Sequence, residues 1–125
     1  MILDTCALLW LASGSKKLSR AALREINSAS AVYVSAISGF EISLKAGKGK
    51  LELSHPVEEW SQRITEHHGL TVLPLNLKIC VAAAELPPIH DDPFDRFIIA
   101  TAKLNDLAVV TADEWFEKYG LKVIC

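Results

Sequence analysis

The sequence has no long hydrophobic run, no excess of positive charge and no basic leader, and each absence excludes a class of protein. No apolar segment reaches the roughly 20 residues that a membrane-spanning helix needs. Thirteen Lys and Arg against fifteen Asp and Glu give a net charge of −2, which disfavours a nucleic-acid binder that relies on bulk positive charge. The start of the chain lacks the basic segment and long apolar core of a signal peptide, so we expect a cytoplasmic protein.

The chain has three cysteines, and their spacing suggests no pairing. Cys6, Cys80 and Cys125 are widely spaced and form no CxxC motif, so no disulfide framework is expected. We interpret them as small thiols that are buried or terminal. What is present is an ordinary globular composition of 125 residues, 50% hydrophobic and 22% charged. A chain of this length can bury a core of its own, and we expect one domain over residues 1–125.

Short apolar runs alternate with longer segments of helical periodicity. Strands are expected at residues 1–4, 31–35, 70–73 and 108–111, with an edge strand at 122–124. Helices are expected at about 5–11, 36–47, 56–67, 77–86, 92–104 and 114–118, with a further helix capped by Ser19 and containing Ala22, Leu23 and Ile26. This alternation predicts a three-layer α/β/α fold around a central, mainly parallel sheet of four to five strands.

Four acidic residues stand at or near the carboxyl ends of the predicted strands. Asp4 ends the first strand, Glu41 lies early in the helix after residues 31–35, and Asp113 follows residues 108–111. Asp95 falls in the first turn of the helix predicted from Asp92, and it joins the others if that helix begins there. Ligands of parallel α/β sheets bind outside this edge, so the four acids mark a candidate site.

Helix capping offers a simpler explanation for each acid, because helix N-termini attract carboxylates. Asp4 can cap the helix that follows it. Ser38 with Glu41, and Thr111 with Glu114, fit the capping-box pattern. Four converging carboxylates, however, repel one another by roughly 1–4 kcal/mol per close pair, and a bound cation relieves that repulsion.

A cation held by carboxylates has a definite chemistry. Hard oxygen ligands suit Mg²⁺ or Mn²⁺. One such ion activates a water or stabilises a phosphate leaving group, and two ions do both together. The acids therefore point to metal-assisted hydrolysis of a phosphodiester.

Four segments together resemble a known family. They are Leu3-Asp4-Thr5, residues 34–42 around Glu41, the run Pro87-Pro88-Ile89-His90-Asp91-Asp92-Pro93-Phe94-Asp95-Arg96, and Val110-Thr111-Ala112-Asp113. In this order, over the whole chain, they resemble the PIN-domain family and, within it, the VapC toxins of bacterial toxin–antitoxin pairs. The run ending at Arg96 is the most specific part of the resemblance.

The resemblance implies a single PIN-like nuclease domain with Mg²⁺- or Mn²⁺-dependent endoribonuclease activity on an RNA substrate. It also implies homodimers, a cognate antitoxin protein that blocks the site, and higher assemblies with that antitoxin. By position, Asp4, Glu41, Asp95 and Asp113 match the catalytic quartet of the family, and Asp4, Asp95 and Asp113 match its metal ligands. Thr5 and Thr111 match neighbouring hydroxyl positions.

Other polar residues near these acids have more than one interpretation each. Asp92 is a helix cap or a contributor to the site. Arg96 orients a carboxylate, binds a phosphate or forms a surface ion pair. Lys45 pairs with Glu41 one turn away or contacts a substrate phosphate. His90 assists proton transfer or serves the turn and its packing.

Two rival functions remain to be weighed. The first is a catalytically silent PIN fold that binds RNA or protein, although the presence of all four acids argues against a decayed site. The second is a receiver or phosphatase domain with a phosphorylated Asp. A receiver needs an acceptor Asp after its middle strand, where Pro74 stands, and a phosphatase of the haloacid dehalogenase type needs a second Asp where Cys6 stands.

Overall fold

The helices and strands alternate along the chain as predicted. The computed structural model describes residues 1–125. Its elements are β1 (Ile2–Leu3), α1 (Thr5–Ser13), α2 (Arg20–Ser28), β2 (Val32–Ser35), α3 (Ala36–Gly47), α4 (Val57–His68), β3 (Leu70–Leu73), α5 (Leu77–Glu85), α6 (Pro93–Asn105), β4 (Val109–Val110), the 3₁₀ helix η1 (Glu114–Tyr119) and β5 (Val123–Ile124). Gly14 and Gly69 end α1 and α4 with φ of +66° and +63°, a conformation that favours glycine.

The five strands form one parallel sheet in the order β3-β2-β1-β4-β5. In the middle of the sheet, Leu3 of β1 pairs with Val34 of β2 on one side and Val110 of β4 on the other. The chain builds outward from β1 to β2 and β3, and returns to the other side of β1 to form β4 and β5. The order of the strands therefore switches between β1 and β4, which is where parallel sheets of this kind place their ligands.

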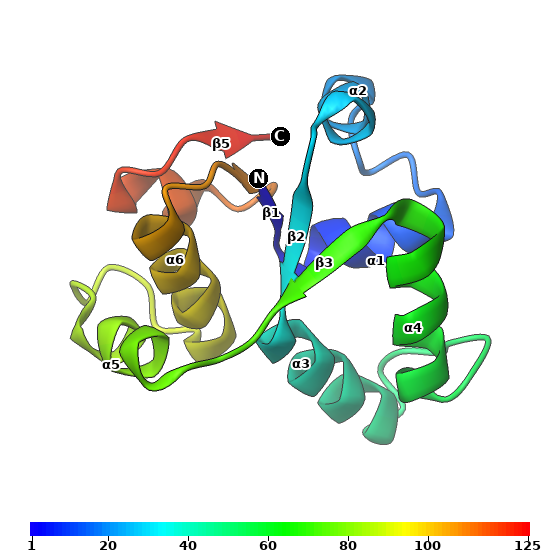
Figure 1. The fold of residues 1–125 in the computed structure, drawn as a ribbon. Helices are drawn as coiled ribbons and strands as arrows, with labels where there is room; N and C mark the ends of the chain where they lie inside the picture. The colour runs from blue at the N-terminus through cyan, green and yellow to red at the C-terminus, as the bar shows by residue number, and fades with distance from the viewer.

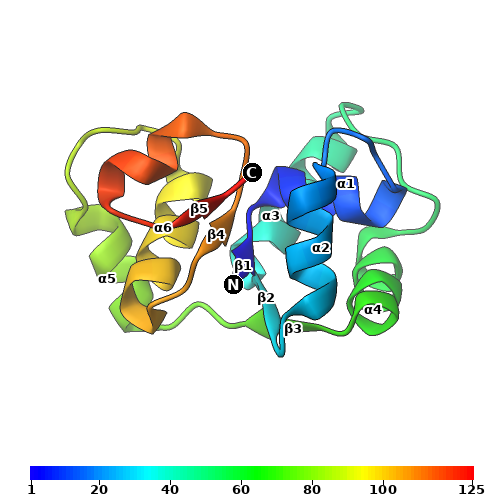
Figure 2. The ribbon, with the colours of Figure 1, turned by 90° about the horizontal axis from the view of Figure 1, so that it is seen from above.

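Helices cover both faces of the sheet, and the prediction of three layers is confirmed. Figures 1 and 2 show α5 and α6 on one side and α1, α2 and α4 on the other. Each side has its own apolar core: Leu8, Ile26 and Trp60 belong to one, and Ile98 and Phe116 to the other. The apolar sequence of the central strands follows from this burial on both faces.

Helix α3 lies beyond the carboxyl end of the sheet and touches both cores, through Ile37 on one side and Ile42 on the other. The stripe of apolar residues on this helix suggests that Phe40 and Leu44 also face inward, and this is wrong. Their exposed fractions are 57% and 38%. Because α3 crosses the end of the sheet rather than covering a face, it buries Glu41 instead of Phe40.

None of the helices is both long and apolar enough to cross a membrane. The three cysteines are free: Cys6 and Cys125 are exposed and Cys80 is partly buried. The interpretation of buried or terminal thiols is wrong for Cys6. This residue is in the first turn of α1, on the side of that helix that faces the strand ends.

Candidate active site

The four acids converge on one hollow at the carboxyl edge of the sheet. Asp4 follows β1 and Asp113 follows the adjacent β4, while Glu41 comes from α3 and Asp95 from α6. Their side chains line a cavity of about 330 Å³, which we call the acidic pocket. Its lining is completed by Thr5, Cys6, Trp10, Lys45, Asp92 and Ala112. The fold thus unites residues that lie more than a hundred positions apart in the sequence.

Asp4 is the deepest of the four acids, with an exposed fraction of 5%. Its Oδ1 accepts a hydrogen bond from the backbone N–H of Ala7 at 2.7 Å, so it does cap α1. Its Oδ2 accepts one from the Thr111 hydroxyl at 2.5 Å. Burial raises the pKa of Asp4, and the nearby charges of Asp113 and Glu41 raise it further. Capping and a place in the pocket are therefore compatible roles for one carboxylate.

Thr111 does not form the predicted capping box with Glu114. Its hydroxyl points to Asp4, and it also accepts a hydrogen bond from the backbone N–H of Asp113 at 3.0 Å. The cap of η1 is Asp113, whose Oδ1 accepts from the backbone N–H of Trp115 at 2.9 Å. The other oxygen of Asp113 remains directed to the pocket.

The predicted box of Ser38 and Glu41 is also absent, because α3 begins earlier and is capped by Ser35. Ser38 is buried inside the helix, where its hydroxyl lies 2.9 Å from that of Thr5. This contact ties the first turn of α1 to α3 under the pocket. Thr5 therefore supports the site through Ser38, a contact that the sequence did not indicate.

Glu41 is buried with one oxygen paired and one unpaired. Its Oε2 lies 3.0 Å from Nζ of Lys45, one helical turn away, so the expected ion pair is present. Burial lowers the pKa of Lys45, but the hydrogen bond and charge of Glu41 outweigh it and raise that pKa overall. Glu41 Oε1 has no hydrogen-bond partner. A buried carboxylate oxygen without a partner is costly, so it indicates a ligand.

Asp95 enters the pocket from the first turn of α6, where the backbone N–H of Asp95 donates to Asp92 Oδ1 at 3.1 Å. Asp92 is thus the cap that the sequence predicts, and it lines the pocket as well. Burial raises the pKa of Asp95 to about 6, with the charges of Asp92 and Asp4 adding to the shift. The hydrogen bond from His90 Nε2, at 2.8 Å from Asp95 Oδ2, acts in the opposite direction.

Arg96 forms neither the carboxylate contact nor the surface ion pair considered for it in the sequence. Its guanidinium contacts no carboxylate. It donates instead to four backbone carbonyl oxygens at 2.8–3.3 Å, those of Ala84, Leu86, Pro87 and His90. These carbonyls belong to the end of α5 and to residues 86–92, which we call the α5–α6 loop. Arg96 therefore shapes the loop that precedes Asp95 rather than the pocket itself.

The donor set of the pocket fits a hard divalent cation. Carboxylate oxygens dominate it, as Mg²⁺ and Mn²⁺ require. The raised pKa values of Asp4 and Asp95 reflect burial together with mutual repulsion that a cation would relieve. One ligand atom from each of His90, Asp95 and Asp113 lies within 4.8 Å of the others. Glu41, whose Oε1 has no partner, lines the same pocket.

Some residues of the site carried little signal in the sequence. Cys6 lines the pocket simply because it follows Asp4 by two residues in α1, a position that could have been read from the helix start. Trp10, one turn further, forms the rim. Tyr119, in η1, contacts the α5–α6 loop, and no pattern in the sequence predicts this contact.

An acidic pocket at the strand switch of a small parallel α/β domain defines a recognisable class of protein. The family model described as "PIN domain" matches residues 1–122. The chain therefore belongs to the PIN domain family, as its motifs suggest.

Comparisons with individual proteins agree with this assignment. The chain is 32% identical over 114 residues to Ribonuclease VapC22 of Mycobacterium tuberculosis (strain ATCC 25618 / H37Rv), covering 90% of this chain and 86% of that protein. Among solved structures, FitAB bound to an IR36 DNA fragment matches with a TM-score of 0.71 at 22% identity, covering 98% of this chain and 92% of the other. DNA-bound VapBC from Salmonella typhimurium matches with a TM-score of 0.69 at 21% identity, covering 98% and 95%. The two structures share the fold of this chain.

Proposed function

We propose that this protein is a metal-dependent endoribonuclease and the toxin of a toxin–antitoxin pair. The observation that carries the proposal is the convergence of four carboxylates, one with an unpaired buried oxygen, on a single pocket at the strand switch. The similarity to a protein named Ribonuclease VapC22 supports RNA as the substrate. The fold shared with VapBC supports an antitoxin as the protein partner.

Asp4, Asp95 and Asp113 would hold Mg²⁺ or Mn²⁺, and Glu41 would complete the catalytic quartet. Asp4 is oriented by Thr111 and Ala7, and each of its oxygens keeps a lone pair for the pocket. A bound divalent ion supplies positive charge that polarises the scissile phosphate and acidifies a water. Glu41 would act as the general base that accepts the proton of the attacking water, through Oε1, the oxygen that has no partner of its own.

The remaining assignments follow the same proposal. Residues 1–125 act as a single PIN-like nuclease domain in the cytoplasm. The protein forms a homodimer, and the antitoxin blocks the acidic pocket, alone or in a higher assembly. Lys45 is partly exposed beside Glu41 and contributes a positive charge on the side from which an RNA phosphate would approach.

The test is RNA cleavage by the purified protein, freed of any antitoxin. The wild-type protein should cut RNA with Mn²⁺ or Mg²⁺ and should stop cutting when EDTA is added. Asp95→Asn should be inactive, whereas Asp91→Asn, which removes an exposed acid outside the pocket lining, should cut like the wild type. The proposal fails if the wild-type protein cuts no RNA with metal and Asp95→Asn behaves identically to it in cells.

Binding of RNA without any cleavage would favour the rival function, a catalytically silent PIN-fold module. The unpaired buried oxygen of Glu41 argues against that rival, because a pocket kept only for its shape has no reason to retain such a group.

A further inference from the structure

The α5–α6 loop carries one side chain, His90, whose place in the fold is fixed from three directions without the acids. Its backbone N–H donates to Tyr119 Oη at 2.9 Å. Its carbonyl accepts from Arg96 Nη1 at 3.0 Å. Its ring stacks on that of Trp115, with centroids 5.8 Å apart and planes 4° apart. The imidazole therefore has a defined position and a defined plane.

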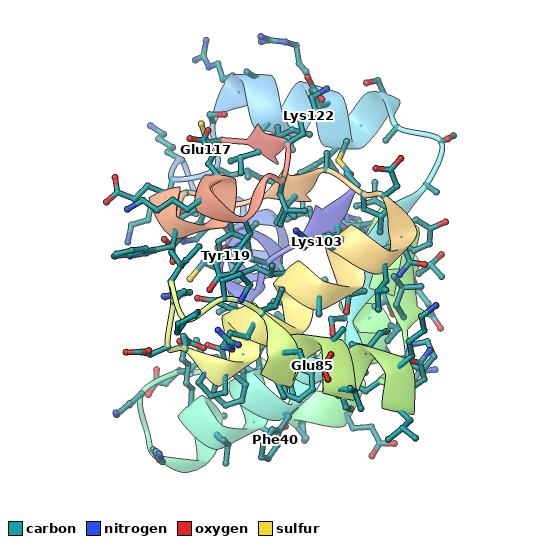
Figure 3. The ribbon with its side chains drawn as sticks, turned by 90° about the vertical axis from the view of Figure 1, so that its left-hand side faces the viewer. Phe40, Glu85, Lys103, Glu117, Tyr119 and Lys122 are labelled. Carbon is teal, nitrogen blue, oxygen red and sulfur yellow. The ribbon has the colours of Figure 1, made fainter.

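The two groups that hold the backbone of His90 are themselves anchored. Tyr119 is buried, its hydroxyl donates to the carbonyl of Pro87 at 2.8 Å, and its own carbonyl accepts from Lys103 Nζ at 2.9 Å. Figure 3 shows Tyr119 lying between η1 and the α5–α6 loop. Arg96 fastens the same loop through its four carbonyl contacts. The loop is thus a rigid mount for the histidine ring.

The ring nitrogen that remains is directed at two acids of the pocket. Nε2 lies 2.8 Å from Asp95 Oδ2 and 3.6 Å from Asp113 Oδ2, and the imidazole is only 16% exposed. Asp95 comes from α6, and Asp113 comes from the segment that follows β4. A single nitrogen therefore spans two carboxylates that no other side chain of the protein connects.

We propose that His90 is a positioning residue that, through Nε2, holds the Asp95 carboxylate in its metal-binding orientation beside Asp113. This inference rests on the proposed metal site. Carboxylates that bind metal ions are themselves held by hydrogen bonds from residues behind them, and losing such a partner costs about 10–100-fold in metal affinity. Packing alone would not explain the arrangement, because stacking on Trp115 requires the ring but no nitrogen at Nε2.

Two substitutions separate the hydrogen bond from the packing. His90→Phe keeps an aromatic ring over Trp115 and removes both ring nitrogens. His90→Gln gives up the ring but retains an N–H near the place of Nε2. Calorimetric titration of Mn²⁺ should give an affinity about 10–100-fold below wild type for His90→Phe. His90→Gln should bind Mn²⁺ with an affinity close to that of the wild type. The metal-free His90→Phe protein should have the same thermal melting temperature as the wild type.

The same experiment contains the results that would overturn the inference. Equal Mn²⁺ affinity in wild type and His90→Phe would leave His90 with packing alone. A nitrogen coupling to Mn²⁺ in the electron paramagnetic resonance spectrum of the wild type would make His90 a direct ligand instead. A wild-type protein that takes up no Mn²⁺ overturns the positioning role as well. By contrast, a wild-type protein that binds Mn²⁺ but cuts no RNA contradicts only the proposed function.

Discussion

The hydroxyl of Thr111 lies 2.5 Å from Asp4 Oδ2 and joins the ends of two adjacent strands, across 107 positions of sequence. The hydroxyl oxygen of Thr111 also accepts a hydrogen bond from the backbone N–H of Asp113. One threonine therefore orients a metal-binding candidate on β1 and fixes the backbone of another after β4. It does so at the strand switch between β1 and β4.

Replacing Thr111 with Val should weaken both folding and metal binding. Valine keeps the shape of threonine but donates nothing, so buried Asp4 Oδ2 loses its partner. We expect the free energy of unfolding to fall by about 1–3 kcal/mol, the cost of an unsatisfied buried acceptor. Urea denaturation and Mn²⁺ calorimetry measure the two effects.

Thr101→Val is the matched control, because Thr101 is equally buried but its hydroxyl donates to the carbonyl of Phe97 within α6. It should leave the Mn²⁺ affinity unchanged. If Thr111→Val also binds Mn²⁺ as the wild type does, Thr111 has no part in arranging the site.

The raised pKa of Asp95 predicts how stability of the metal-free protein depends on pH. Its pKa is about 6 in the folded protein and 3.8 for an unperturbed carboxyl, so between these values the folded state holds the extra proton. Stability should therefore fall as pH rises from about 4 to about 6 and change little from this group above that. The full shift corresponds to about 3 kcal/mol. Since the side chain is 20% exposed and partly screened, we expect about 1–2 kcal/mol.

Urea denaturation in EDTA between pH 4 and 7 tests this dependence. Asp95→Asn should flatten the slope, and Asp91→Asn should preserve it. Mn²⁺ should bind more tightly as pH rises through about 6, because the ion competes with the proton for the carboxylate. Identical slopes in wild type and Asp95→Asn would mean that Asp95 is already ionised in the metal-free protein at low pH.

Much of the fold was predictable because its signals are local. Alternating apolar runs and periodic segments indicated the parallel sheet and its layers, and Asp92-Pro93 indicated the start of α6. The inward face of α3 was not predictable from its apolar stripe. Helices are expected to bury their apolar side against a sheet face, but α3 crosses the sheet end, where Glu41 is needed and Phe40 is left outside.

The acids of the site were predictable from strand ends, whereas their supports were not. Asp4 and Asp113 each follow a strand, Asp95 lies in the first turn of α6, and Glu41 lies early in α3. The partners of Thr111 and Arg96 depend instead on which loops meet in three dimensions. The local sequence around Ser38 or Thr111 does not tell whether the hydroxyl caps its own helix or contacts a distant residue. The capping boxes predicted for both residues were wrong for this reason.

Replacing Arg96 with Lys should loosen the α5–α6 loop. The planar guanidinium reaches four carbonyls from one position, and a single ammonium cannot reproduce that fork. We expect a loss of about 2–3 kcal/mol in unfolding free energy, typical of hydrogen bonds to a charged group. Hydrogen exchange at the backbone amides of residues 89–92 should accelerate more than at residues of α1.

Arg63→Lys is the control for this change, since Arg63 forms an exposed ion pair with Glu59 on α4. Pairs of that kind contribute about 0–1 kcal/mol, so its stability should stay near that of the wild type. Equal losses of stability in Arg96→Lys and Arg63→Lys would show that the four carbonyl contacts of Arg96 do not stabilise the loop.

The substitution Glu41→Gln tests whether Glu41, whose buried Oε1 has no partner, serves catalysis rather than stability. The amide keeps the shape of the side chain but cannot accept the proton of an attacking water. The lost ion pair with Lys45 should cost little stability, because the Lys45 side chain is 40% exposed and solvent partly screens the pair. Single-turnover RNA cleavage should therefore slow by about 10²–10⁴-fold, the usual contribution of a general base, while the urea midpoint stays close to the wild-type value. Glu58→Gln, on the exposed side of α4, should change neither quantity. A variant that loses stability and activity in proportion would instead make Glu41 a structural residue whose charge the fold itself requires.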